Sequence, residues 1–458
     1  MNRVAGPVRA LVLTLTLAGC AVGPTYRTPP VAAGEGYVSA EALAQGAGDQ
    51  RFDPGAVPGQ AWWKAFGSPA LDALVAQALA HSPTLASAQA TLRAARQGVV
   101  AARGGLSPTV QVGDSRTWER YSSIPGQPGA IYAVTTAQVS VVYSFDLFGG
   151  QRRAIESAKA QAEAARFEAV GAADSLSANV VASTLKIAAL DAQAAATRAI
   201  MDAQARQLAL VQDQLAAGSA SLGDRVAAEA QLEAARGALA GLDQSLDAAR
   251  HQLAILIGQS PAQPLPPLPA LADLALPRDL PVSLPSTLVA QRPDIRAQAA
   301  RLHQACAQVG VADAAVLPQI SLSGGYATNL WSLTAGVSQT LFQGGALNAE
   351  RKAAVDRYQA AQADYRSVVL LAFQNVADVL SALGHDAAAE QAALRALDDA
   401  DSGLTLAQDR NTVGAVGLAP LLAAQTQAQQ ARVTWLQARA ARAADTVALF
   451  QALGGGWG

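Results

Sequence analysis

A repeat within the chain constrains its fold more than any other feature of the sequence. Residues 208–236, LALVQDQLAAGSASLGDRVAAEAQLEAAR, return in register as residues 404–432, LTLAQDRNTVGAVGLAPLLAAQTQAQQAR. The two copies match without a gap at a constant offset of 196 residues (404 − 208). Each copy predicts a long helix, a break at Gly218 or Gly414, and a second helix that leaves at once, because glycine tolerates the positive φ of a tight helical turn. The repeat therefore predicts two halves of one architecture.

Composition indicates long, closely packed helices. Alanine dominates the chain, and alanine has the highest helix propensity and lets helix axes approach closely. Charged residues make up 15% of the sequence, against about 25% in an ordinary soluble domain. The formal net charge is −2, so the balance of charge does not point to a nucleic-acid partner.

Residues 1–19 have the organisation of a signal peptide rather than of folded structure. Two arginines precede a short apolar run, which is too short to span a bilayer as a mature helix. The run ends in Leu17-Ala18-Gly19-Cys20, which looks like a bacterial lipobox, so we expect Cys20 to become the lipidated N-terminus. Alanine follows Cys20, in place of the aspartate that in many such lipoproteins signals retention at the inner membrane, which favours the outer membrane. The alternative is an ordinary signal peptide with an incidental cysteine.

Prolines, glycines and hydrophobic periodicity divide the mature chain into parts. Residues 20–68 predict an extended, Pro- and Gly-rich N-terminal tether that carries the lipid anchor. Residues 69–260 form the first repeat and residues 286–458 the second, joined by a Pro-rich linker at 261–285. Each repeat is expected to contain a helix, a β-hairpin and a long helical hairpin, with β-hairpins at 108–147 and 318–342 and helical tips near 218 and 414.

An alternating run over 131–145 carries the strand prediction, and such a run is long enough for a transmembrane β-strand of ~9–11 residues. The second hairpin is expected to be shorter, from 320–322 and 333–341. The long helices, 151–217 and 346–413, exceed the returning helices 222–257 and 418–453. Shorter helical segments at 286–316 and at 71–106, the latter with a break at His81-Ser82-Pro83, are therefore expected to complete the returning columns end to end.

Four strands with two open edges cannot lie in a bilayer alone, because every backbone polar group there needs a partner. Closure therefore requires further copies of the chain. Three copies would give 12 strands, an even-numbered barrel of ordinary size, and three is the most economical choice.

Several short motifs, in this order and with this doubling, resemble the TolC-like outer-membrane efflux proteins, in particular the lipoprotein branch that serves RND-type pumps. The resemblance covers essentially the whole mature chain. Its carriers are Cys20-Ala21-Val22-Gly23-Pro24-Thr25-Tyr26, Trp62-Trp63-Lys64-Ala65-Phe66, Leu147-Phe148-Gly149-Gly150, Leu341-Phe342-Gln343-Gly344-Gly345, Phe373-Gln374-Asn375-Val376-Ala377-Asp378, the two glycine tips, and Leu453-Gly454-Gly455-Gly456-Trp457.

The resemblance implies a mostly α-helical, mixed α/β membrane protein. It would be a homotrimer with a 12-stranded outer-membrane β-barrel, four strands from each chain, continuous with a long periplasmic α-helical barrel. Its expected function is that of a passive exit duct for small molecules, with a periplasmic membrane-fusion (adaptor) protein and an inner-membrane RND-type pump as partners. Lipids of the outer membrane would surround the barrel. The resemblance implies no cofactor beyond the lipid on Cys20.

The tip departs from the family pattern. Many relatives carry aspartates six and nine residues after the second tip glycine, where this chain has Pro420 and Ala423, whereas Asp224 is kept after Gly218. Asp224 is therefore the candidate for a latch that holds the tip closed, and its alternative role is that of a solvated helix cap. The other candidate gate residues are Arg410 and Asn411 as latch partners, and Leu418, Leu421 or Leu422 as an apolar constriction.

Other classes of protein fit the sequence less well. It has no nucleophile elbow, phosphate loop or CxxC pair, and its four histidines are scattered singly, so we expect no catalytic, cofactor-binding or metal-ligating residues. A type I secretion duct would share the same fold and is an open alternative. A structural coiled-coil outer-membrane lipoprotein would explain the long helices but neither the paired alternating runs nor the repeat.

Overall fold

The computed structural model describes residues 21–30, 36–39, 41, 43, 46–121, 128–327 and 330–456. Cys20 and the signal segment lie outside the described residues. The chain divides into two compact units. The first contains residues 1–30, 90–167 and 296–367, and the second contains residues 31–89, 168–295 and 368–458. Four helices begin in one unit and continue in the other, and they are Pro83–Gly104 (α4), Gly150–Ala216 (α5), Pro293–Ala315 (α8) and Ala346–Thr412 (α9).

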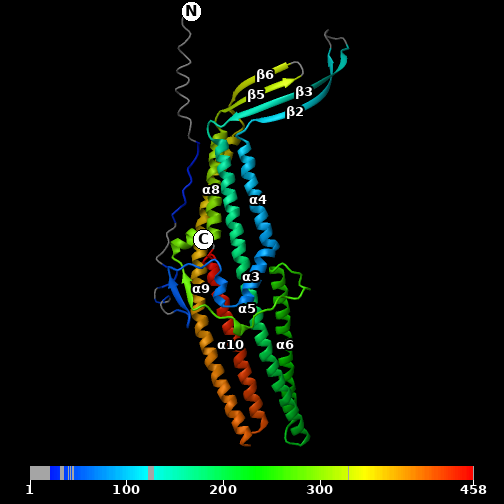
Figure 1. Ribbon diagram of the computed structural model, residues 1–458, viewed down its shortest axis with the longest axis vertical. Helices are drawn as coiled ribbons and strands as arrows, with labels where there is room; N and C mark the ends of the chain where they lie inside the picture. The colour runs from blue at the N-terminus through cyan, green and yellow to red at the C-terminus, as the bar shows by residue number, and fades with distance from the viewer. Residues whose placement is uncertain are drawn as a thin grey trace, which may run out of the picture. The chain divides into compact units, whose positions relative to one another are not determined.

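The first unit contains a four-stranded antiparallel sheet in the order β2-β3-β5-β6 (Figure 1). Its strands are Thr109–Tyr121 (β2), Ala130–Phe145 (β3), Gln319–Ala327 (β5) and Leu330–Ser338 (β6). Successive strands pair in sequence order, so each half of the chain supplies one hairpin and the halves meet where β3 pairs with β5. Strands β2 and β6 are the two edges of this sheet, and among the described residues each has no partner strand on one side.

Three helices share the core of the first unit. The buried side chains include Ile155 and Phe167 of α5, Leu302 of α8 and Tyr365 of α9. Buried alanines lie between them on the same helices, and alanine permits close approach of the helix axes. Helix α5 begins directly after β3, and the Asp146 carboxylate caps it by accepting hydrogen bonds from the backbone amides of residues 151 and 152.

The second unit is helical, with a small parallel sheet at its periphery. Its remaining helices are Pro69–His81 (α3), Leu222–Leu256 (α6), Pro285–Gln291 (α7) and Leu418–Ala452 (α10), with short 3₁₀ helices at Trp62–Phe66 (η2) and Leu271–Asp273 (η3). The Trp62 ring stacks on Phe450 of α10, with the ring centroids 4.9 Å apart, and Phe66 is fully buried. This aromatic packing fixes the end of the N-terminal segment onto the helices.

The structure corrects two expectations from the sequence. Residues 20–68 are not simply an extended tether, because Arg51–Pro54 (β1) pairs in parallel with Asp279–Val282 (β4) of the Pro-rich linker. In the second hairpin, β5 continues through Gly324 and Gly325 to Ala327, and β6 ends at Ser338 rather than at residue 341. The sequence underestimated the length of β5 because the two glycines interrupt the apolar alternation without interrupting the backbone pairing.

One described helix, α9, contains an 18-residue window apolar enough to cross a membrane by length and composition, with a mean hydropathy of 1.5 and 28% of it buried. Exposed leucines on α9 include Leu370 and Leu371, at 62% and 53% exposure. An apolar helix surface of this kind on a single chain is typical of a contact with another element or another copy.

Candidate functional site

The sheet of the first unit has one apolar face. Side chains alternate along each strand, and the antiparallel register places even-numbered residues of β2 and β5 on the same face as odd-numbered residues of β3 and β6. Most of these side chains are exposed in the single chain, for example Val112 at 82% and Leu333 at 67%. The apolar residues of this face are Val110, Val112, Trp118, Ile131, Val139, Val141, Tyr143, Phe145, Ile320, Leu322, Tyr326, Trp331, Leu333, Ala335 and Val337.

The opposite face is polar over most of its length. It carries Thr109, Gln111, Ser115, Thr117, Gln138, Ser140, Ser144, Gln319, Ser321, Ser323, Ser332, Thr334 and Ser338. An apolar face opposite a polar face is the pattern of a transmembrane β-barrel wall, with lipid outside and water inside. The sheet therefore has the chemistry of a channel wall.

Aromatic side chains mark both ends of the apolar face. Tyr143 and Phe145 contact edge to face near the end where β3 leads into α5, with ring centroids 4.8 Å apart. At the other end of the second hairpin, Tyr326 lies opposite Trp331 in the register. Aromatic girdles at both membrane–water interfaces are a feature of outer-membrane barrels.

The first described residues are built into the first unit beside the sheet. The Val22 amide donates to the Phe148 carbonyl over 3.0 Å, just after β3 ends. Arg153 of α5 donates to the carbonyls of Val22 and Gly23, at 3.0 and 3.2 Å. Gly23 has φ +93°, and a Cβ there would overlap the backbone of Gly310. The described segment that begins at residue 21 is therefore attached to the boundary between strand β3 and helix α5.

A charged cluster continues this attachment. Glu156 accepts hydrogen bonds from Arg153 and from His303 of α8, both over 2.8 Å. The Tyr26 ring stacks on His303 with centroids 4.3 Å apart, and its hydroxyl donates to the Ala299 carbonyl. Burial alone would raise the pKa of Glu156, but the hydrogen bonds from His303 and Arg153 outweigh it and hold the pKa below its usual range. His303 is thus a satisfied structural histidine.

The two helical tips have the same backbone geometry. Gly218 has φ +78° and Gly414 has φ +72°. At the first tip, the amide of Ser219 donates to the carbonyl of Gln214 over 2.8 Å. At the second, the amide of Ala415 donates to the carbonyl of Arg410 over 2.8 Å, 196 residues later (415 − 219). The sequence repeat is therefore a repeat of turn structure, in which a left-handed glycine closes each long helix.

Within the chain, the candidate latch residues make local contacts. The Asp224 carboxylate accepts from the amide and the hydroxyl of Ser221, both over 2.8 Å, and the Ser221 hydroxyl accepts from the Asp224 amide. This is a capping box at the start of α6. These hydrogen bonds lower the pKa of Asp224. The Asn411 side chain donates to the Val416 carbonyl within its own turn, and the Arg410 side chain is exposed.

The candidate apolar gate residues differ in exposure. Leu422 is 2% exposed, so it packs inside the helical hairpin of its own chain. Leu421 is half-buried and Leu418 is 40% exposed. Only Leu418 and Leu421 therefore present a substantial surface from which a constriction between copies can be built. The N-cap of α10 is Gly417, which has no side chain to form a capping box like that at the first tip.

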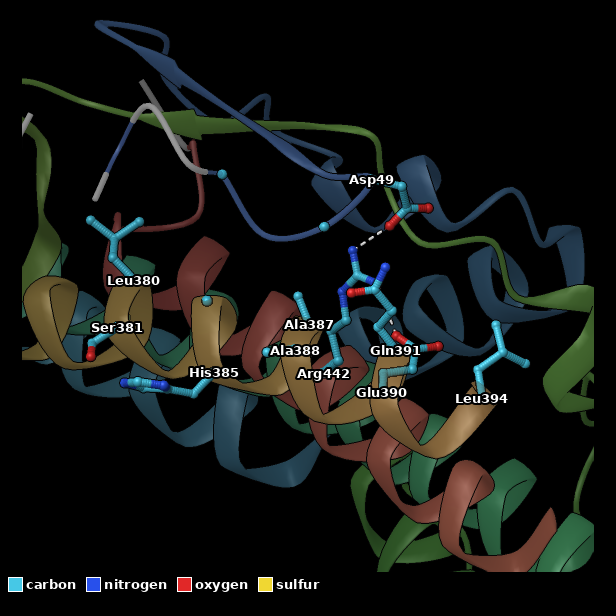
Figure 2. Close-up of a pocket in the computed structure, with 13 residues that line it drawn as sticks. Asp49, Leu380, Ser381, His385, Ala387, Ala388, Glu390, Gln391, Leu394 and Arg442 are labelled. Carbon is cyan, nitrogen blue, oxygen red and sulfur yellow. Dashed lines mark hydrogen bonds and ion pairs between the residues drawn. The ribbon is translucent and has the colours of Figure 1, made fainter. Parts of the chain in front are cut away.

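A buried arginine on α10 was not found by sequence reasoning. Arg442 donates to Glu390 of α9 over 2.9 Å, to Asp49 and to the Gln50 side chain, and it forms one wall of a pocket (Figure 2). Gln50 in turn donates to the Pro277 carbonyl of the linker over 2.8 Å. The pocket is lined by charged, small and apolar side chains from residues 46–49 and from α9. Through these hydrogen bonds Arg442 fastens the N-terminal segment to helices α9 and α10.

The whole arrangement defines a class of protein: an outer-membrane channel subunit in which long helical hairpins continue from a two-faced β-sheet. The family model for outer membrane efflux proteins matches residues 74–259 and 284–455, and the chain belongs to this family.

Relatives and solved structures agree with this assignment. The chain is 31% identical over 467 residues to the pyoverdine export outer membrane protein OpmQ of Pseudomonas putida, covering 98% of this chain and 97% of the relative. It is 29% identical to the outer membrane protein OprJ of Pseudomonas aeruginosa, covering 100% of this chain and 97% of that one. The solved structure of the outer-membrane channel OprN is similar with a TM-score of 0.83, at 29% identity, covering 96% of this chain and 100% of OprN. The TolC-like fold, the outer-membrane location and the efflux function expected from the sequence are thereby confirmed.

Proposed function

We propose that three copies of this chain form the exit duct of a tripartite efflux system that carries small molecules from an inner-membrane pump across the outer membrane. The observation that carries the proposal is the two-faced sheet with two unpaired edges, on a chain that belongs to the efflux family. The duct itself is passive, and we assign no catalytic role to any of its residues. The relatives are named for efflux and export, which favours efflux over a type I secretion duct.

Closure of the sheet supports the trimer. In the part of the chain that the structure describes, the amides and carbonyls along the outer sides of β2 and β6 have no partner strand, and an unpaired backbone group costs several kcal/mol in hydrocarbon. Pairing β6 of one copy with β2 of the next satisfies both edges. Three copies then complete a 12-stranded barrel, whose apolar face meets lipid and whose polar face lines the pore.

The attachment of the first residues supports a lipid on Cys20. Residue 20 precedes a segment that is hydrogen bonded at Val22 to the end of β3. The aromatic pair Tyr143 and Phe145 marks the membrane interface at this end of the sheet. An acyl chain on Cys20 would therefore enter the inner leaflet beside the barrel. Mass spectrometry should find the wild-type N-terminus acylated, and Cys20→Ser should remove the acyl mass, whereas an unmodified wild-type chain would refute the proposal.

The proposed docking end is formed by the two glycine tips, where a periplasmic adaptor protein of an RND-type pump would bind. Valine at Gly218 or Gly414 meets no steric obstacle, but a β-branched residue is disfavoured at positive φ, at a cost of about 1–3 kcal/mol. The strain is confined to the turn, so folding of the rest of the chain should survive.

An efflux assay in cells tests this assignment. Gly218→Val and Gly414→Val should each increase sensitivity to exported compounds at unchanged trimer levels. Gly237→Val, in the exposed middle of α6, is the matched control, and it should leave efflux intact. Normal efflux in both tip variants would remove the tips from the docking site.

A further inference from the structure

The hairpin β2–β3 continues past the end of the second hairpin, as Figure 1 shows. Ala327, the last residue of β5, pairs with Gln138, which pairs with Gly113 of β2. Among the described residues, residues 130–137 of β3 therefore pair with β2 (residues 114–121) and not with β5. On the apolar face, this extension carries Arg116 and Arg120, so two cations stand on the side of the sheet that turns to lipid.

The height of these arginines follows from the register. Tyr326 and Trp331, which mark the outer interface, align with Val112 of β2. Arg116 lies four residues further along β2, which is roughly 14 Å along the strand and, at a barrel tilt of ~40°, roughly 10 Å in height. That is the depth of lipid headgroups, which occupy the zone just outside the hydrocarbon core. Arg120 lies two residues beyond Trp118 on the same face, roughly 7 Å further along the strand, above the same zone.

The side chains next to Arg116 are of the kinds that bind a charged sugar. The Arg116 guanidinium lies over the Trp118 ring, 5.2 Å from the ring centroid. Trp118 is 65% exposed, so much of its surface is accessible. A guanidinium binds phosphate through two parallel hydrogen bonds, and an exposed indole face packs against the apolar face of a sugar ring.

We propose that Arg116, Trp118 and Arg120 form a binding site for the phosphorylated saccharide headgroup of an outer-leaflet glycolipid. The proposal rests on the barrel described above, because the barrel turns this face outward. Asp114 lies on the same face and leaves a net positive charge of one. The occupant is therefore an anion. Because the site is continuous with the apolar, lipid-facing face of the sheet, we identify this anion as a lipid. Such a site would order glycolipid around each hairpin and seal the protein–lipid boundary.

Binding to the purified assembly in detergent tests the site. The probe is a glycolipid with two phosphates on a disaccharide headgroup, compared with the same glycolipid after phosphatase treatment, and bound lipid is counted by native mass spectrometry. Arg116→Gln with Arg120→Gln should weaken binding of the phosphorylated form by at least about tenfold. The matched control, Arg27→Gln with Lys352→Gln, removes the same charge outside the sheet from two exposed positions and should bind as wild type does.

The possible results of this binding experiment distinguish failure of the glycolipid site from failure of the proposed trimeric barrel. Equal binding by the double arginine variant and the wild type would overturn the site while leaving the barrel intact. Wild-type protein that holds the dephosphorylated glycolipid as tightly as the phosphorylated one would also overturn it, and this comparison does not depend on any variant folding. Wild-type protein that forms no barrel would refute the proposed assembly, and the glycolipid site with it.

Discussion

At the scale of single residues, the Arg442 cluster makes the sharpest stability prediction. The side chains of Arg442 and Glu390 are 7% and 12% exposed. Breaking a buried pair by removing one partner leaves an uncompensated charge, at a cost of roughly 3–5 kcal/mol. Arg442→Met should therefore lower the midpoint of thermal unfolding strongly. Arg442→Met combined with Glu390→Gln should recover part of the loss, and a single variant as stable as the wild type would contradict the account.

Asp174 of α5 makes a prediction about pH. Burial raises the pKa of Asp174 to about 7. The positive charge of Arg292 acts in the opposite direction but does not outweigh burial. Because the folded pKa lies above the unfolded value, the protonated form stabilises the fold at low pH. This contribution is lost as pH rises from about 4 to about 7.

Asp174→Asn should therefore raise the thermal midpoint at pH 8 much more than at pH 4, by an amount equivalent to roughly 2–4 kcal/mol. Asp202→Asn, an exposed position on the same helix, is the control and should change the pH dependence little. A pH dependence of stability that is the same in Asp174→Asn and the wild type would show that Asp174 is already ionised in the fold.

At the scale of elements, the role of Asp224 at the start of α6 can be tested, because a helix cap and a gate latch predict different results. Loss of the capping box weakens the start of α6 whether it is removed through Asp224 or through Ser221. Only Asp224→Ala also removes the carboxylate, whereas Ser221→Ala leaves it in place.

If Asp224 latches the closed tip, single-channel recordings in planar bilayers should show a higher open fraction for Asp224→Ala and not for Ser221→Ala. Equal gating in the two variants would make Asp224 a cap alone. Closure would then rest on apolar residues such as Leu418 and Leu421.

The same scale shows what the sequence could predict. The ends of the long helices were predicted to within one or two residues. Glycine and proline mark where these helices end, and helical hydrophobic periodicity continues between those marks. The β1–β4 pair was missed because each strand has four residues, both contain proline, and the strands lie more than 200 residues apart. The Arg442 cluster was missed for a similar reason, since its hydrogen bond to Gln50 spans 392 residues. Local patterns do not encode contacts at such a separation.

At the scale of the whole molecule, the surfaces that a single chain leaves uncovered indicate how copies of the chain assemble. The sheet has two free edges and an exposed apolar face, and α9 exposes Leu370 and Leu371. A stable soluble monomer would not leave these surfaces uncovered. Neighbouring copies account for the edges and the helix surface, and lipid accounts for the apolar face. The proposed assembly thus covers the edges of the sheet, its apolar face and the exposed leucines of α9.

The most direct measurement is an electron cryomicroscopy reconstruction of the wild-type protein in lipid nanodiscs, without imposed symmetry. The account predicts three chains around one axis and a closed barrel of 12 strands, in which β6 of each copy pairs with β2 of the next. It also predicts that Val112 and Leu333 face lipid while Gln111 and Thr334 face the pore. A monomer, an open sheet, or a barrel with the polar face turned to lipid would contradict it.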